Sequence, residues 1–166
     1  MATIGITGSE GLIGTALAEA LTSRGDVVRR LDLCLPTGHP CAGDVRHRES
    51  VLRLLSGCDG VVHLAAVSRV IFGERDPRLC WDTNVLGTQA VIDACLEKTP
   101  RPWMLFASSR EVYGQAASLP VSEEAPLRPL NVYGRSKVEA EGRVLAARGA
   151  GLCSAVLRFS NVYGST

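Results

Sequence analysis

A short apolar strand near the start of the chain runs into three evenly spaced glycines and then directly into a helical pattern. The apolar segment 3–6 precedes Gly8, Gly11 and Gly14, and apolar residues recur at helical spacing from Leu12 onward. In such a unit the glycines permit a tight turn, close approach of a pyrophosphate, and close helix–strand packing. The start of the helix adds unpaired N–H groups and a positive dipole end. The spacing differs from the usual G-x-G-x-x-G pattern. The prediction of a phosphate-binding loop therefore rests on the position of the glycines between a strand and a helix.

The same strand–helix order repeats along the rest of the chain. Strand-like apolar segments lie at 26–32, 43–45, 60–66, 103–107 and 153–159, and helical patterns lie at 12–24, 48–56, 77–98 and 132–148. We expect the proline-rich segment 115–130 to be an ordered surface loop. The alternation predicts one α/β domain over residues 1–166, with a doubly wound parallel sheet of the Rossmann type and ligands at the carboxyl ends of its strands.

Composition matters here for the partners and sites that it disfavours. The formal net charge is +1 and no apolar run is long enough to cross a bilayer, so neither a nucleic acid nor a membrane is indicated as a partner. The six cysteines are scattered, without C-x-x-C or paired histidine spacing, which argues against a metal site and a disulfide framework. Reduced thiols and the absence of a signal peptide predict a cytoplasmic protein.

An acidic residue ends the second predicted strand. Asp32 lies 18 residues after Gly14, near the position where dinucleotide-binding folds place the carboxylate that holds the adenosine ribose. A carboxylate there repels a 2′-phosphate and therefore favours NAD over NADP, although Arg29 and Arg30 are a weak indication in the opposite direction. The alternative is a solvated aspartate in a turn.

Tyr133 and Lys137 are four residues apart in a predicted helix and therefore lie on one face of it. A nearby ammonium group, together with a nicotinamide cation, lowers the pKa of a tyrosine, which makes the pair a candidate acid/base. Only two of the 18 basic residues are lysines, so a lysine at this position favours a specific role for its compact ammonium group. Ser109 follows a buried strand and is a candidate to bridge a substrate oxygen and Tyr133. The alternatives are a surface pair for the first two residues and a turn residue for the serine.

The predicted strand 60–66 contains a histidine and ends in two small residues. We favour a packed, hydrogen-bonded role for His63 over a role as a ligand. The pair Ala65 and Ala66 leaves room beside the strand end for a flat, bulky group.

Taken together, these motifs resemble the extended short-chain dehydrogenase/reductase family, and within it the NAD-dependent epimerase/dehydratase branch that acts on nucleotide-activated sugars. The matching segments follow the order of that family along the whole chain, at 7–14, 44–45, 63–66, 84–88, 108–114, 133–137 and 157–164. The resemblance implies NAD as a cofactor that is reduced and reoxidised within one turnover, and a nucleotide sugar as substrate.

The resemblance also implies a role for each matching position. The pyrophosphate is held by Gly8, Gly11, Leu12, Ile13 and Gly14. Asp32 holds the adenosine ribose, and the adenine is flanked by Asp44 and Val45. The path to the nicotinamide is lined by Leu64, Ala65 and Ala66, with support from Asn84. The acid/base is Tyr133, assisted by Ser109 and Lys137, and both Tyr133 and Lys137 also contact the cofactor. The sugar nucleotide is contacted by Ser109 and Asn161.

Glu111 bears on the net reaction. Simple 4-epimerases of this family usually carry a small or polar residue at this position, whereas sugar 4,6-dehydratases and nucleotide-sugar decarboxylases carry a glutamate. Such a carboxylate can remove the C5 proton once C4 is a ketone. The dehydratases have an aspartate immediately before it, and here Arg110 takes that place. Epimerisation, dehydration and decarboxylation therefore stay open, as does a structural pairing of Glu111 with an arginine.

Family members are considerably longer than this chain, which ends at Thr166. We therefore expect a chain truncated after its cofactor-binding part, without most of the substrate-binding part. An alternative is a catalytically silent NAD-binding module or fragment that needs another chain, and a further one is NADPH-dependent reduction of a non-sugar ketone, which Asp32 disfavours. The resemblance also implies a homodimer formed through the helices 77–98 and 132–148.

Overall fold

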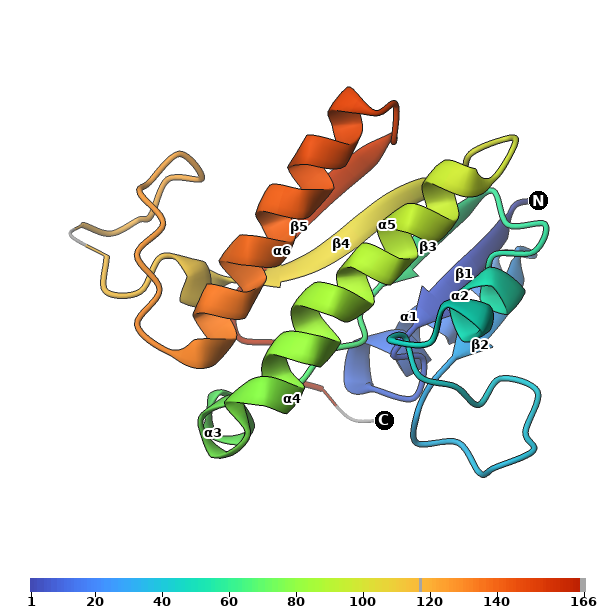
Figure 1. The fold of residues 1–166 in the computed structure, drawn as a ribbon, viewed down its shortest axis with the longest axis horizontal. Helices are drawn as coiled ribbons and strands as arrows, with labels where there is room; N and C mark the ends of the chain where they lie inside the picture. Colours follow the sequence, from blue (N-terminus) through green and yellow to red (C-terminus); the bar gives the residue numbers. More distant parts are fainter. Residues whose placement is uncertain (117, 165–166) are drawn as a thin grey trace.

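A five-stranded parallel sheet forms the centre of the protein (Figure 1). The computed structural model describes residues 1–116 and 118–164. The strands are β1 (Thr3–Thr7), β2 (Val27–Leu31), β3 (Gly60–His63), β4 (Trp103–Ser109) and β5 (Ser154–Phe159), in the order β2-β1-β3-β4-β5. The order reverses between β1 and β3, and ligands of doubly wound sheets bind beside such a reversal. The predicted α/β fold class is confirmed.

Helices cover the two faces of the sheet unequally. The helical elements are α1 (Leu12–Ser23), α2 (Arg48–Leu54), α3 (Val70–Arg75), α4 (Pro77–Trp81), η1 (Asp82–Leu86), α5 (Gly87–Glu97), η2 (Arg110–Val112) and α6 (Val132–Gly149). Figure 1 shows α5 and α6 side by side on one face and α1 behind the sheet. Val61, Met104 and Phe106 pack in a core with α2, α5 and α6, whereas Ile6 and Val62 pack with α1. This alternation is the two-residue period of a strand buried on both faces.

The single long helix expected at 77–98 is divided. It consists of α4, the π-helical turn η1 and α5, and it is preceded by the short helix α3, which the sequence analysis did not predict. Pro77 starts α4 and the side chain of Asp76 caps it, accepting a hydrogen bond from the N–H of Leu79 at 2.9 Å. A π turn inside a helix frequently marks a functional position, and η1 carries the buried Asn84.

Two strand predictions were wrong. The short strand expected at 43–45 is absent among the described residues, where only an isolated bridge joins Asp32 to Ala42. Two prolines and a positive-φ glycine lie in the segment 36–42, and prolines cannot donate to a sheet ladder. The strand expected at 60–66 ends at His63, so Ala65 and Ala66 lie in the following loop.

The remaining boundaries agree with the sequence to within a few residues. Asn131 caps α6, accepting a hydrogen bond from the N–H of Gly134 at 2.7 Å. β4 continues two residues further than expected, to Ser109, and the 3-10 turn η2 was not predicted. The segment 115–130 is a loop in its described part, and residue 117 and the final residues 165–166 lie outside the described residues. In the part of the chain that the structure describes, no helix has both the length and the apolarity needed to cross a membrane.

One part of the sheet has little cover. On the side of α1, β4 and β5 pair Leu105 with Ala155 and Ala107 with Leu157. Ala155 is exposed and Leu157 is 40% exposed, because α1 packs mainly over β1, β2 and β3. β5 is also an edge strand, since within residues 1–116 and 118–164 only β4 pairs with it.

Candidate active site

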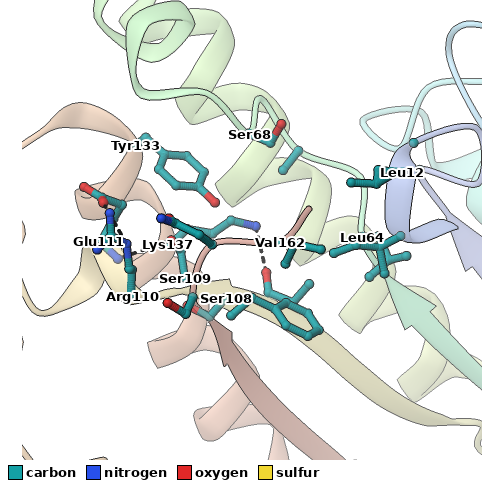
Figure 2. Close-up of a pocket in the computed structure, with 18 of the residues that line it drawn as sticks. Leu12, Leu64, Ser68, Ser108, Ser109, Arg110, Glu111, Tyr133, Lys137 and Val162 are labelled. Carbon is teal, nitrogen blue, oxygen red and sulfur yellow. Dashed lines mark hydrogen bonds and ion pairs between the residues drawn. The ribbon is translucent and has the colours of Figure 1, made fainter. Parts of the chain in front are cut away.

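The largest group of predicted site residues meets in a cavity of about 480 Å³ at the carboxyl ends of the strands. Figure 2 shows Leu12 and Leu64 at one end of this cavity and Tyr133 and Glu111 at the other. Twelve residues expected to act in the site line it: Gly8, Gly11, Leu12, Ile13, Gly14, Leu64, Ala66, Ser109, Glu111, Tyr133, Lys137 and Asn161. They come from α1, β4, η2, α6 and the loops after β1, β3 and β5.

The glycine loop has the form that a phosphate cradle requires. Gly8 has φ +70°, and a Cβ on it would lie 2.7 Å from the backbone nitrogen of Ala65. A Cβ on Gly14 would collide with the carbonyl oxygen of Gly8 and lie 2.8 Å from Cα of Ser9. Gly11 is the N-cap of α1 and makes no side-chain cap, so the first N–H groups of the helix stay available to a ligand. These residues fit the pyrophosphate of a dinucleotide.

Tyr133, Lys137 and Ser109 lie together at the other end. Figure 2 shows the Tyr133 ring and the Lys137 side chain extending into the cavity from α6, with Ser109 at the end of β4. The Nζ of Lys137 donates a hydrogen bond to the carbonyl oxygen of Ala107 at 2.8 Å. It also lies 5.9 Å from the centre of the Tyr133 ring and 4.8 Å from that of Phe106. The buried ammonium is thereby fixed beside the phenol.

Burial dominates the electrostatics of this group. It lowers the pKa of Lys137 to about 8, against the opposing influence of Cys80 and Glu141. It also raises the pKa of Tyr133, although a hydrogen bond with the Ser109 hydroxyl acts in the lowering direction and Glu111 and Cys80 add to the increase. The protein groups alone therefore do not lower the pKa of the Tyr133 phenol. The lower pKa expected from the sequence depends on the positive charge of a bound nicotinamide.

Glu111 is held by its neighbours. One carboxylate oxygen accepts a hydrogen bond from the side-chain amide of Asn131 at 2.8 Å, and the other lies 3.7 Å from Nε of Arg110. Because Asn131 also caps α6, Glu111 supports the start of the helix that carries Tyr133. The carboxylate lies on the cavity wall and has the structural partners that the sequence analysis left open as an alternative.

Five expected site residues do not line the cavity: Asp32, Asp44, Val45, Ala65 and Asn84. Asp32 ends β2 beside the glycine loop, and its carboxylate accepts hydrogen bonds from the N–H groups of Glu10 at 2.9 Å and Cys34 at 2.8 Å. Asp44 is paired with Arg46 at 2.5 Å. The side-chain amide of buried Asn84 bonds both backbone groups of Val67, so it acts as a support.

A family model described as the NAD dependent epimerase/dehydratase family matches residues 4–166. The chain belongs to this family. The family resemblance drawn from the motifs is thereby confirmed.

The relatives compared with this epimerase/dehydratase family member share about a third of its residues. A UDP-glucose 4-epimerase from Streptomyces lividans is 31% identical over 172 residues, which is 96% of this chain and 52% of that protein. The structure of MoeE5 in complex with UDP-glucose and NAD superimposes with a TM-score of 0.87 at 34% identity, over 98% of this chain and 55% of that one. For the Brucella ovis UDP-glucose 4-epimerase in complex with NAD, the TM-score is 0.86 at 31% identity, over 97% and 52%. The chain thus spans about half the length of the curated relatives it matches.

The sequence analysis of this family member missed a buried polar cluster behind the site. The hydroxyl of Ser108 donates to the carboxylate of Glu141, which also accepts a hydrogen bond from Nη2 of Arg158 at 2.8 Å. Arg158 donates in turn to the hydroxyl of Tyr113 at 2.7 Å. Glu141 lies one helical turn after Lys137, and this spacing of a glutamate after the lysine was the signal available in the sequence.

The sequence contains no comparable spacing that would have predicted several other residues of the cavity wall. Ser68 and Val70 belong to the loop after β3 and the start of α3, and Phe159, Ser160 and Val162 to the end of β5 and its loop. Their positions depend on how the loops fold over the strand ends. Within residues 1–116 and 118–164, no group of three or more His, Cys, Asp or Glu side chains is arranged to hold a metal ion.

Proposed function

We propose that this chain is the NAD-binding and proton-transferring part of a nucleotide-sugar 4-epimerase. The observation that carries the proposal is that the glycine loop and the group Ser109, Tyr133 and Lys137 line one cavity. Two of the proteins named above are UDP-glucose 4-epimerases, and both solved complexes contain NAD. Bound NAD supplies a hydride acceptor that also returns the hydride. Asp32 at the end of β2 favours NAD over NADP.

The protein residues handle the proton. Tyr133 accepts the proton of a sugar hydroxyl at its phenolic oxygen and later returns it, which is general acid/base catalysis. Ser109 lies on the same cavity wall as Tyr133, and its hydroxyl orients the reacting oxygen. Lys137 stabilises the phenolate because its ammonium is held by Ala107 beside the ring. Asn161 lies on the same cavity wall and contacts the sugar nucleotide.

Epimerisation is favoured over dehydration and decarboxylation by the partners of Glu111. A carboxylate that removes a C5 proton must be free to approach the sugar. Glu111 is instead bonded to Asn131 and faces Arg110, where a second acid would be needed for dehydration. A product analysis separates the three reactions, because only epimerisation leaves the composition of the sugar unchanged.

The test measures NAD binding and the interconversion of UDP-glucose and its 4-epimer by the chain. Tyr133→Phe is expected to lower the rate by at least about 100-fold while NAD affinity is retained, because it removes only the proton-transferring hydroxyl. Tyr163→Phe is the control, since Tyr163 is 94% exposed. Full activity in Tyr133→Phe would overturn the assignment.

A second candidate is a NAD-binding module that is silent without another polypeptide. The observation in its favour is that the chain spans only about half of its relatives. It predicts NAD binding without conversion of UDP-glucose. Turnover by the isolated chain would exclude it.

We also propose a homodimer formed through the outer faces of α4, η1, α5 and α6. Support comes from Trp81 and Leu86, two large apolar residues that are 39% and 48% exposed on this helical run. A cytoplasmic location is proposed as well, and its support is that all six cysteines are unpaired.

A further inference from the structure

His63 is a buried histidine that the proposed chemistry does not use. It ends β3, is 1% exposed, and both ring nitrogens have hydroxyl partners. Nδ1 lies 2.7 Å from Oγ1 of Thr7, the last residue of β1, and Nε2 lies 3.0 Å from Oγ1 of Thr88 in α5. Burial lowers the pKa of His63 to about 3, with a smaller contribution from Lys137. The ring is therefore neutral, with one nitrogen donating and the other accepting.

The neighbours determine which nitrogen carries the proton. The hydroxyl of Thr88 donates to the carbonyl oxygen of Asn84 at 2.6 Å, so its oxygen is left to accept from Nε2–H. Oγ1 of Thr7 already accepts from the N–H of Ala65 at 3.2 Å, which leaves its own hydrogen for Nδ1. The opposite tautomer would leave the hydroxyl hydrogen of Thr7 without an acceptor in a buried position, which is unfavourable.

The hydrogen bonds continue beyond Thr88 to the catalytic helix. The side-chain amide of Asn84 donates to the hydroxyl of Ser136 at 2.9 Å, and that hydroxyl donates to the carbonyl oxygen of Tyr133 at 2.7 Å. Asn84 belongs to the π turn η1, where it also holds the loop after β3 through Val67. A buried path of hydrogen bonds thus runs from Ala65 to Tyr133.

The other end of the path reaches the phosphate-binding loop. Thr7 immediately precedes Gly8, and the backbone of Ala65 lies so close to Gly8 that a Cβ there would be 2.7 Å from its nitrogen. The position of Ala65 is therefore set by both the glycine loop and the hydroxyl of Thr7.

We propose that His63, as the neutral Nε2–H tautomer, is a positioning residue that couples the glycine loop to the helix carrying Tyr133. This coupling rests on the proposed function, in which the glycine loop binds NAD and the Tyr133 phenol transfers a proton in the same reaction. His63 touches neither the cavity nor the reacting atoms, and it acts through Thr7 on one side and Thr88 and Asn84 on the other.

The first test is heteronuclear NMR of the histidine ring nitrogens in the unmodified chain without ligand. The chain has three histidines, and exposed His39 and His47 serve as internal references. His63 is expected to show the shifts of a neutral Nε2–H ring from about pH 5 to about pH 9. An Nδ1–H tautomer or a charged ring would overturn the proposal. This spectrum requires no NAD binding, so its outcome is independent of the proposed function.

The second test removes one hydroxyl from the path. Thr88→Val is expected to move the Cζ shift of Tyr133 and to weaken NAD binding about tenfold, because Nε2–H loses its partner. Thr22→Val is the matched control, since Thr22 donates to the carbonyl of Ala18 at 2.7 Å in the same local geometry within α1. Thr88→Ser is expected to restore both readouts.

A Tyr133 signal that stays unchanged in a folded Thr88→Val chain would overturn the coupling. If the Thr88→Val variant does not fold, the His63 tautomer in the unmodified chain alone decides whether the proposal stands. Absence of NAD binding by the unmodified chain, with the expected tautomer and Tyr133 shift, would instead contradict the proposed function alone.

Discussion

Lys137 is a buried cation, and Glu141, a buried acidic residue, follows one turn further along α6. The Glu141 carboxylate is shared between Ser108, which precedes Ser109, and Arg158 on β5. One side chain thus connects α6, β4 and β5 directly behind the catalytic group. A buried ion pair of this kind is costly to break, because the partner that remains is charged and desolvated.

Replacing Glu141 by glutamine is therefore expected to destabilise the protein by about 3 kcal/mol. Glu139→Gln is the matched control on the same helix, where Glu139 pairs with Arg143 at 3.0 Å in a more exposed position. That substitution is expected to change the free energy of unfolding by less than about 1 kcal/mol. Urea unfolding of both variants measures the difference, and equal losses would contradict the importance assigned to Glu141.

His63 makes stability depend on pH in the acidic range. Its pKa is about 3 in the folded protein and has an ordinary value of 6.5, so between these values the unfolded chain binds a proton that the folded chain does not. Stability due to this group is fully present above pH 6.5 and is lost as pH falls toward 3, at about 1.4 kcal/mol per pH unit.

The measurement compares unmodified protein with His63→Asn, because carboxylates titrate in the same range and cancel in the difference. The stability advantage of the unmodified protein is expected to shrink by about 2 kcal/mol between roughly pH 6.5 and pH 4.5. A constant difference would show that folded His63 is already protonated in this range.

Glycine has different roles in the helices α1 and α6. Gly14 lies in the first turn of α1, where a Cβ would collide with the backbone of Gly8 and Ser9. Gly142 lies in α6 on an exposed face, where a Cβ would meet nothing within 4 Å. The first glycine is required by close packing, whereas the second only lowers the helix propensity of α6.

Alanine substitutions separate these two cases. Gly14→Ala is expected to push α1 away from the loop, with loss of stability and of NAD affinity. Gly142→Ala is expected to stabilise the protein by about 0.5–1 kcal/mol without effect on NAD binding. Thermal unfolding and NAD titration of both variants provide the measurement, and a neutral Gly14→Ala would contradict the tight packing.

The sequence predicted the elements that have strong local signals. The helices expected at 77–98 and 132–148 begin where Pro77 lacks an N–H and where Asn131 caps the first turn, and apolar segments such as 3–6 and 103–107 form strands. These signals depend only on neighbouring residues.

Other features depend on contacts distant in the sequence, and the sequence could not supply them. The π turn at Asn84 and the positions of Ser68 and Arg158 arise from partners more than a dozen residues away, such as Val67, Ser136 and Glu141. Twelve of the expected site residues converge on the cavity, because the order of strands and helices was predicted correctly and places them at the carboxyl end of the sheet. Asp32, Asp44 and Val45 do not line it, and the strand expected at 43–45 does not form.

For the whole molecule, the proposed dimer surface is the point most open to experiment. Leu86 is 48% exposed in the π turn, on the outer side of the helical run. Leu86→Glu is expected to produce monomers in sedimentation experiments, because it would place a charge in an apolar interface. Leu119→Glu is the control, since Leu119 is 85% exposed in the loop before α6. A dimer that persists in Leu86→Glu would contradict this surface.

The uneven cover of the sheet also affects how the molecule behaves at high concentration. Ala155 and Leu157 form an apolar strip on β5, and the guanidinium of Arg158 is paired with Glu141. β5 contains no lysine or proline, the residues with which natural proteins commonly protect an edge strand. We therefore expect charged substitutions at Leu157 to extend the concentration range in which this chain can be handled.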